Sequence, residues 1–187
     1  MAIKFSEIKK YLSRVVRLSI CFEDGHYDNY TMLADIPEGK YDDLYVFGVG
    51  MVDVEFSLDV YSEPKEFPER VSIGRGFFLG CGLEIVLTEK PRDIERCNKE
   101  ELTFDDLRDY LQIGRNFSIV TKESWEEENY EWNRDIPEKY NDMYVYGIGI
   151  EDNPEELFKT LKYGLIDTNL AKKMRIVVSE CAKNCTK

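Results

Sequence analysis

The chain has 187 residues and a formal net charge of −12, from 37 Asp and Glu against 25 Lys and Arg. Its hydrophobic share of 43% is enough for a packed core, which excludes global disorder. No apolar run approaches the roughly 20 residues of a membrane span, and no cationic leader is present. We therefore expect a cytoplasmic protein, and the odd count of five cysteines fits free thiols in that reducing compartment.

Two stretches, one at the start of each half, predict short helices. In residues 5–12 and again in 104–111, apolar side chains recur at positions i, i+3, i+6 and i+7 of one helical face. Thr103, followed by Asp105 and Asp106, is a favourable start, because its hydroxyl can cap a free backbone N–H. We expect a helix over each stretch.

A hairpin is predicted after each helix. Residues 17–22 and 116–121 are rich in β-forming side chains, and residues 30–34 and 130–133 predict the returning strands. The polar sequences EDGHYDN and KESWEEEN lie between them and are typical of turns. These turns differ sharply between the two copies, whereas the flanking strands agree.

The clearest repeat is DIPEGKYDDLYVFGVGMVD at residues 35–53, which returns as DIPEKYNDMYVYGIGIED at 135–152 once Gly39 is removed. Each copy predicts a turn and then a strand with one bulky face, which includes Phe47 and Val49. The opposite face carries two glycines, which favours a bend in the strand or close approach by another backbone or a helix. A nucleotide-binding loop is not indicated, because the third glycine of that motif is missing.

The last part of each half differs between the copies. Residues 54–60 alternate as a half-buried strand, 62–82 predict a surface connection, and 83–89 match 174–180 as strands. In the second copy, residues near 154–163 carry a first-turn proline and an apolar stripe, which predict an added helix.

These patterns predict an α+β fold of internally duplicated helix-plus-antiparallel-sheet units that are related by a pseudo-two-fold axis. The first α+β repeat spans residues 1–97, and the second spans residues 98–187 and includes the added helix. The divergence between the copies indicates that the two halves have different roles.

The turn of the second hairpin is the best candidate for a binding site. An aromatic side chain there supplies rigid contact area, and the acidic side chains beside it select a basic partner. The alternative is a solvated turn in which the tryptophan is an ordinary loop residue. The candidate partner-binding residues, including two from the first hairpin, are Trp125, Glu126, Glu127, Glu128, Asp24 and Asp28.

No residue is identified as catalytic or as a metal ligand, and we expect no cofactor. His26 is the one histidine and lies in the first turn, where its counterpart in the second copy is Trp125. The two halves therefore cannot share histidine chemistry. Cys181 and Cys185 lack the further ligands that a tetrahedral zinc site requires.

We expect a non-enzymatic acidic binding protein that mimics nucleic acid and occludes the basic site of a nuclease or another nucleic-acid-binding protein. The same charge opposes direct binding to nucleic acid or a membrane. In bulk character the chain is similar to anti-CRISPR and anti-restriction proteins of phages and mobile elements. The alternatives are an immunity protein that neutralises a basic toxin, a carboxylate-dependent hydrolase with an acidic pair near His26 or a cysteine, and a structural module whose duplication mimics a homodimer.

Overall fold

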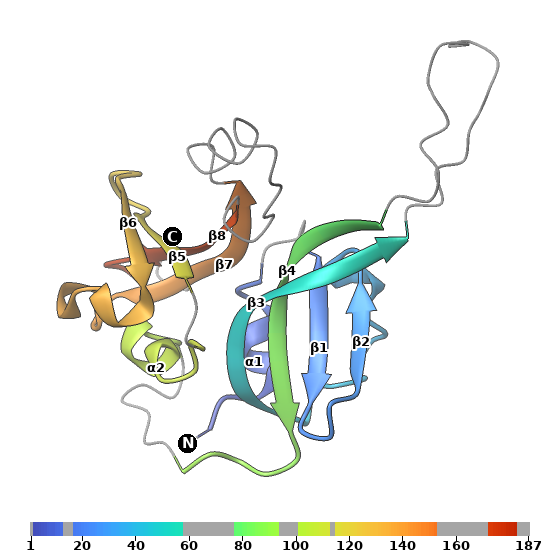
Figure 1. Ribbon diagram of the computed structural model, residues 1–187. Helices are drawn as coiled ribbons and strands as arrows, with labels where there is room; N and C mark the ends of the chain where they lie inside the picture. The colour runs from blue at the N-terminus through green and yellow to red at the C-terminus, as the bar shows by residue number, and fades with distance from the viewer. Residues whose placement is uncertain are drawn as a thin grey trace, which may run out of the picture.

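Two four-stranded β-sheets, one from each half of the chain, form most of the described structure (Figure 1). The computed structural model describes residues 2–12, 17–57, 77–93, 101–112, 115–152 and 172–182. The first half contains α1 (Phe5–Lys9), β1 (Leu18–Phe22), β2 (Tyr27–Tyr30), the 3-10 turn η1 (Leu33–Asp35), β3 (Tyr45–Ser57) and β4 (Phe77–Thr88). The second half contains α2 (Phe104–Arg108), β5 (Arg115–Thr121), β6 (Glu127–Trp132), η2 (Asn133–Asp135), η3 (Glu138–Tyr140), β7 (Tyr144–Asp152) and β8 (Lys172–Ser179).

The two sheets have the same topology. Their strand orders are β2-β1-β4-β3 and β6-β5-β8-β7. The outer pairs of each sheet are antiparallel, but the central pairs, β1 with β4 and β5 with β8, are parallel. The sheets are mixed rather than purely antiparallel, because β4 and β8 each insert between the first and third strands of their half.

The predicted α+β class, with helix-plus-antiparallel-sheet units, is wrong, because the described residues are mostly strand and contain two α-helices of five residues each. The chain leaves the predicted helices early in order to pair with the other half. Leu12 forms a parallel bridge with Ile148 in β7, and Leu111 forms one with Val49 in β3. The apolar positions that predicted a longer helix therefore belong to a short helix and to the residue after it that forms a β-bridge with the other half.

These bridges are reciprocal. The N–H of Ile148 donates to the carbonyl of Tyr11 at 2.7 Å, and the N–H of Val49 donates to the carbonyl of Tyr110 at 2.7 Å. Each half therefore extends the sheet of the other by the same contact, as in the interface of a symmetric dimer.

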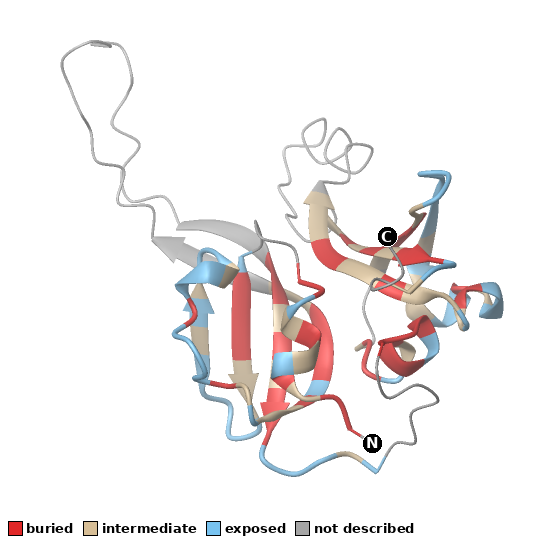
Figure 2. Ribbon diagram, turned by 180° about the vertical axis from the view of Figure 1, so that it is seen from behind, coloured by how far each residue is buried: buried red, intermediate tan, exposed pale blue. Residues whose placement is uncertain are grey.

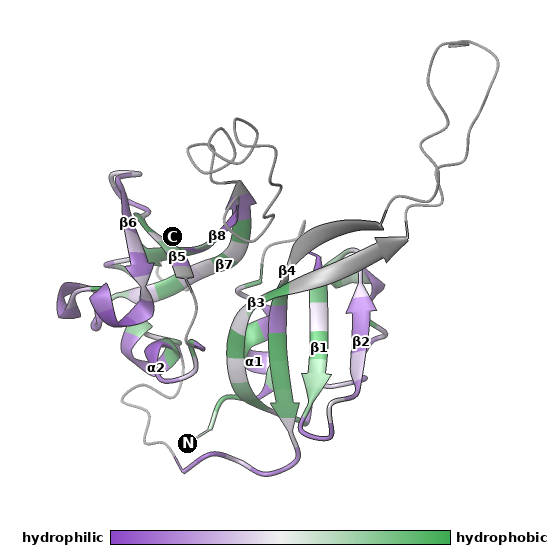
Figure 3. Ribbon diagram, viewed as in Figure 1, coloured by the Kyte–Doolittle hydropathy of each residue, from purple (hydrophilic) through white to green (hydrophobic). Residues whose placement is uncertain are grey.

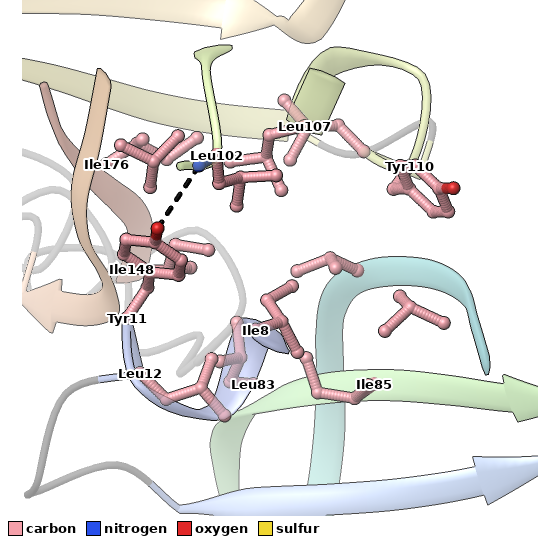
Figure 4. Packing of buried hydrophobic residues seen from close by; sticks show 14 of the residues in the cluster. Ile8, Tyr11, Leu12, Leu83, Ile85, Leu102, Leu107, Tyr110, Ile148 and Ile176 are labelled. Carbon is pink, nitrogen blue, oxygen red and sulfur yellow. Dashed lines mark hydrogen bonds between the residues drawn. The ribbon is translucent and has the colours of Figure 1, made fainter. Parts of the chain in front are cut away.

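The side chains of the same two tyrosines also cross between the halves. The Tyr11 hydroxyl accepts a hydrogen bond from the N–H of Leu102 at 3.1 Å (Figure 4), and the Tyr110 hydroxyl accepts one from the N–H of Ile3 at 3.2 Å. Both rings are buried in one hydrophobic cluster that includes residues of both sheets and both helices. The two halves thus share a core.

A bulge changes which side chains of β3 face that core. Alternation predicted that Phe47 and Val49 lie on the same face, but the register of β3 against β4 shifts between Val46 and Gly48. Val46 and Val49 are fully buried as a result, whereas Phe47 is 46% exposed.

The two glycines of β3 make room for a side chain from the second half. A Cβ at Gly48 would lie 2.8 Å from Nε2 of Gln112, and one at Gly50 would lie 2.5 Å from Oε1 of the same residue. The close approach expected from the sequence is therefore made by a glutamine side chain, not by a backbone or helix. In β7 the nearest atoms to a Cβ at Gly147 are 3.8 Å away.

Several predictions lie on residues outside the described ranges. They include the added helix near 154–163, most of the connection at 62–82, and the boundary between residues 97 and 98. Within the described ranges, no helix has the length and apolarity needed to cross a membrane.

Candidate partner-binding site

The second hairpin places its candidate residues at a tip and along an edge strand. Glu127 pairs with Val120, and Glu128 pairs with Ile119, so the turn between β5 and β6 occupies residues 122–126. The edge strands β2 and β6 are hydrophilic, in contrast to the central strands β1 and β4 of the first sheet (Figure 3). Charged edge strands resist pairing with other chains, so some of these acidic side chains protect the sheet edges from aggregation.

The tip is fixed to the end of β8. The Glu123 carboxylate accepts hydrogen bonds from the Ser179 hydroxyl at 2.5 Å and from the N–H of Glu180 at 3.2 Å. The N–H of Lys122 donates to the carbonyl of Val178 at 2.8 Å. Partial burial opposes ionisation of Glu123, but the hydrogen bonds from Ser179 and the backbone outweigh it and lower the pKa of this carboxyl. The turn is thus held in place before any partner arrives.

Trp125 is held out from this turn in a left-handed conformation. Its side chain is 66% exposed and its φ is 58°, a conformation that is strained for a bulky residue. Its N–H donates to the carbonyl of Thr121 at 2.7 Å. In the first hairpin the N–H of Gly25, at φ 82°, donates to the carbonyl of Phe22. Gly25 is therefore the structural counterpart of Trp125, in place of the His26 that the sequence suggested.

The three consecutive glutamates have different surroundings. Glu127 forms an ion pair with Lys173, and Glu128 forms one with Lys139 at 2.5 Å. Glu126 is exposed, and among the described residues it has no cationic partner. Its carboxylate lies 3.4 Å from the hydroxyl of Ser124, which also accepts the N–H of Glu126 at 3.2 Å. Only Glu126 of the three is thus left to meet a cation from outside.

Glu128 also receives a hydrogen bond from Tyr130 at 2.6 Å, within a cluster of acid, lysine and two tyrosines. The hydrogen bond from Lys139, followed by those from Tyr130 and Tyr140, lowers the pKa of Glu128 to about 2. Burial of the Tyr130 ring, and then its hydrogen bond to the same carboxylate, raises the pKa of Tyr130. The cluster ties the repeated turn to the edge strand.

The first half has the same cluster around Asp28. Lys40 donates to Asp28 at 2.8 Å and to Tyr30 at 3.0 Å, while the hydroxyl of Tyr41 donates to the same Asp28 carboxylate. The hydrogen bond from Lys40, and then that from Tyr41, lowers the pKa of Asp28. Because both halves retain this arrangement, we interpret Asp28 and Glu128 as residues that hold the fold together.

The two hairpin tips do not form one surface. They lie at opposite ends of the molecule in both views, the first near the bottom and the second near the top (Figures 1 and 2). Asp24 closes its own turn by accepting the N–H of His26 at 2.9 Å. The structure therefore brings together Trp125 and Glu126, and it leaves Asp24 and Asp28 apart from them.

His26 has the surroundings of a turn residue. Its Nε2 lies 3.7 Å from a carboxylate oxygen of Asp28, and its ring stacks on Phe22. Within the described part of the chain, the side-chain hydrogen bonds to this pair come from Lys40 and Tyr41, and none comes from a cysteine, serine or threonine. The same residues include no group of three or more His, Cys, Asp or Glu side chains placed to hold a metal ion.

Sequence reasoning missed a second acidic surface, beside α2. In the first half Lys4 pairs with Asp43 at 3.3 Å. Thr103 takes the place of this lysine in the second half, so Asp142, the counterpart of Asp43, is exposed and has no ion pair among the described residues. Asp105 is exposed nearby on α2. A position-by-position comparison of charge between the two copies would have revealed this difference.

The depressed pKa of Glu128 predicts a loss of stability in acid. Its folded-state value of about 2 lies below the usual 4.5, so the ion pair stabilises the fold above about pH 4.5 and is lost as the pH falls toward 2. The difference in melting temperature between wild type and Glu128→Gln should therefore shrink across this window. Glu131→Gln removes a charge from the same strand and is the matched control. A constant difference for Glu128→Gln would contradict the ion pair.

No model of a protein family matches the chain, and neither a curated protein nor a solved structure is significantly similar to it.

Proposed function

We propose that this protein is a non-enzymatic inhibitor that binds a cationic surface of another protein through the β5–β6 tip. The observation that supports this role best is Trp125, whose bulky side chain is 66% exposed on a strained backbone. Such strain is retained where the surrounding structure fixes it, and it is concentrated at functional sites. Tryptophan is also the residue type most enriched among the strongest contacts of protein interfaces.

The charge of the chain selects the class of partner. A net charge of −12 repels nucleic acid and anionic lipid and attracts a basic protein. The cationic groove of a nuclease or another nucleic-acid-binding protein has the complementary charge, and an acidic protein seated in it would exclude the nucleic acid. Nucleic-acid mimics of the anti-CRISPR and anti-restriction type would act in this way, and we propose a cytoplasmic location for this protein.

Occlusion can be tested with the full-length chain. Wild type and Trp125→Ala are immobilised, and proteins retained from a host lysate by wild type alone are released with a salt gradient. Each released protein is then titrated with a labelled DNA duplex in the presence and absence of wild type. Competitive loss of DNA binding, weakened by added salt, is the expected result. Undiminished DNA binding at saturating inhibitor would contradict the proposed function.

A further inference from the structure

We infer that Glu123 is a positioning residue for partner binding, and that its hydrogen bonds to the end of β8 hold Trp125 in the conformation that exposes the indole. This inference rests on the proposed function, since it identifies how the β5–β6 tip is kept ready for its partner. It also assigns a role to Ser179, which is buried and lies 56 positions from Glu123 in the sequence.

The turn is anchored at three points around Trp125. The N–H of Trp125 donates to the carbonyl of Thr121 at 2.7 Å, which closes the turn on itself. The N–H of Lys122 and the carboxylate of Glu123 then join the turn to the end of β8. A bulky residue at φ 58° is strained, and such a conformation persists where the surrounding contacts fix the backbone. Of these three anchors only that of Glu123 is made by a side chain, so a substitution can remove it and leave the two backbone bonds in place.

The end of β8 presents two oriented donors to this carboxylate. The hydroxyl of Ser179 donates to Glu123 at 2.5 Å, and the N–H of Glu180 donates to the same oxygen at 3.2 Å. The Ser179 hydroxyl is itself held in place, because it accepts the N–H of Cys181 at 3.1 Å. The carboxylate therefore binds to a fixed position on β8, and the turn is fixed with it.

The first hairpin lacks this connection. Asp24 takes the place of Glu123, and it closes its own turn by accepting the N–H of His26 at 2.9 Å. Thr88 at the end of β4 takes the place of Ser179, and among the described residues no hydrogen bond joins it to Asp24.

This difference follows the residue at the left-handed position of each tip. Gly25 adopts φ 82° without a steric penalty, so the first turn needs no further support. Trp125 adopts φ 58° against a penalty, and its turn is the one joined to the neighbouring strand. This is the distribution expected if the bond from Ser179 to Glu123 serves to position the tryptophan.

The test compares the full-length wild type with Ser179→Ala, which removes the donor hydroxyl and retains both Glu123 and Trp125. We expect the NMR order parameter of the Trp125 N–H to fall from about 0.85 to below about 0.6. Proteins that wild type retains from a host lysate, and Trp125→Ala does not, should bind Ser179→Ala about tenfold more weakly, because the turn must then become ordered on binding. Ser179→Thr keeps the hydroxyl and should restore both values.

Two further variants separate positioning from other roles. Thr88→Val removes the corresponding hydroxyl from the first half and should change binding by less than about twofold. Glu123→Ala combined with Ser179→Ala should bind within about twofold of Ser179→Ala alone, because the two side chains act through one bond. A much weaker double variant would overturn the inference, since Glu123 would then contact the partner directly.

A Trp125 N–H that stays rigid in Ser179→Ala would also overturn the inference. These outcomes are separable from failure of the proposed function. If a retained protein depends on Trp125 but binds Ser179→Ala as tightly as wild type, occlusion stands and the positioning role falls. If Ser179→Ala frees the Trp125 N–H and weakens retention, but DNA binding by the retained proteins is unaffected by wild type, the positioning role stands and occlusion falls.

Discussion

Trp125→Gly is expected to make the protein more stable and a weaker binder at the same time. Glycine adopts the left-handed conformation without the clash that a side chain creates, so relief of this strain should stabilise the fold by about 1 kcal/mol. For a chain of this size that corresponds to a rise in melting temperature of about 2–4 °C. Loss of the exposed indole should weaken partner binding by about 2 kcal/mol or more, roughly 30-fold.

Gly25→Ala provides a control of opposite sign. Gly25 has φ 82° in the other tip, and a Cβ there would meet no atom within 4 Å, so only backbone strain is added. This variant should lose about 1 kcal/mol of stability and bind the partner normally. Thermal unfolding and a binding titration on both variants measure the two effects. A Trp125→Gly protein that is less stable, or that binds as wild type does, would show that the tryptophan serves the fold.

Higher stability together with weaker binding in Trp125→Gly would show that Trp125 contributes to partner binding and not to stability. Positions that lower stability without a structural gain are typical of functional sites. By the same reasoning, the acid–lysine–tyrosine clusters of Asp28 and Glu128 are structural, because each stabilises its own half through contacts that both copies share.

Local sequence patterns predicted the strands better than the helices. The repeated stretch and the first strand of each hairpin are strand as expected, since alternating apolar residues are a signal that neighbours in the chain create. The returning strands begin earlier than predicted, at Tyr27 and Glu127, and residues 31–34 are not strand. The helices end early because Leu12 pairs with Ile148 and Leu111 pairs with Val49, and each of these partners is more than 60 residues away along the chain. A periodicity within eight residues carries no information about such a partner.

The candidate site could be predicted only in part for the same reason. Trp125 and Glu126 are adjacent in sequence, and their exposure follows from the hairpin turn. The neutralisation of Glu127 depends on Lys173 in β8, 46 positions away, and that of Glu128 depends on Lys139 in the repeated turn. Net charge therefore overstated how many of the carboxylates at this tip remain to meet a partner.

Tyr11→Phe is expected to lose more stability than Tyr110→Phe, because the buried hydroxyl of Tyr11 makes the stronger contact between the halves. Tyr11 is 2% exposed, and its hydroxyl donates to the carboxylate of Glu101 at 2.9 Å while it accepts the N–H of Leu102 at 3.1 Å. Glu101 is itself 6% exposed. Removal of the oxygen takes a hydrogen bond from a buried carboxylate and from a buried N–H, which should cost about 2–3 kcal/mol.

Tyr110→Phe is the matched variant in the reciprocal position. Its hydroxyl accepts the N–H of Ile3 at 3.2 Å, with no charged group in that bond, so the expected loss is about 1 kcal/mol. Denaturant unfolding of both variants should show a lower midpoint with an unchanged slope, since the area exposed on unfolding stays the same. Because the halves share one core, each variant should unfold in a single transition. Equal losses would mean that the hydrogen bond from Tyr11 to Glu101 adds no stability. A separate early transition in Tyr11→Phe would mean that the halves unfold independently.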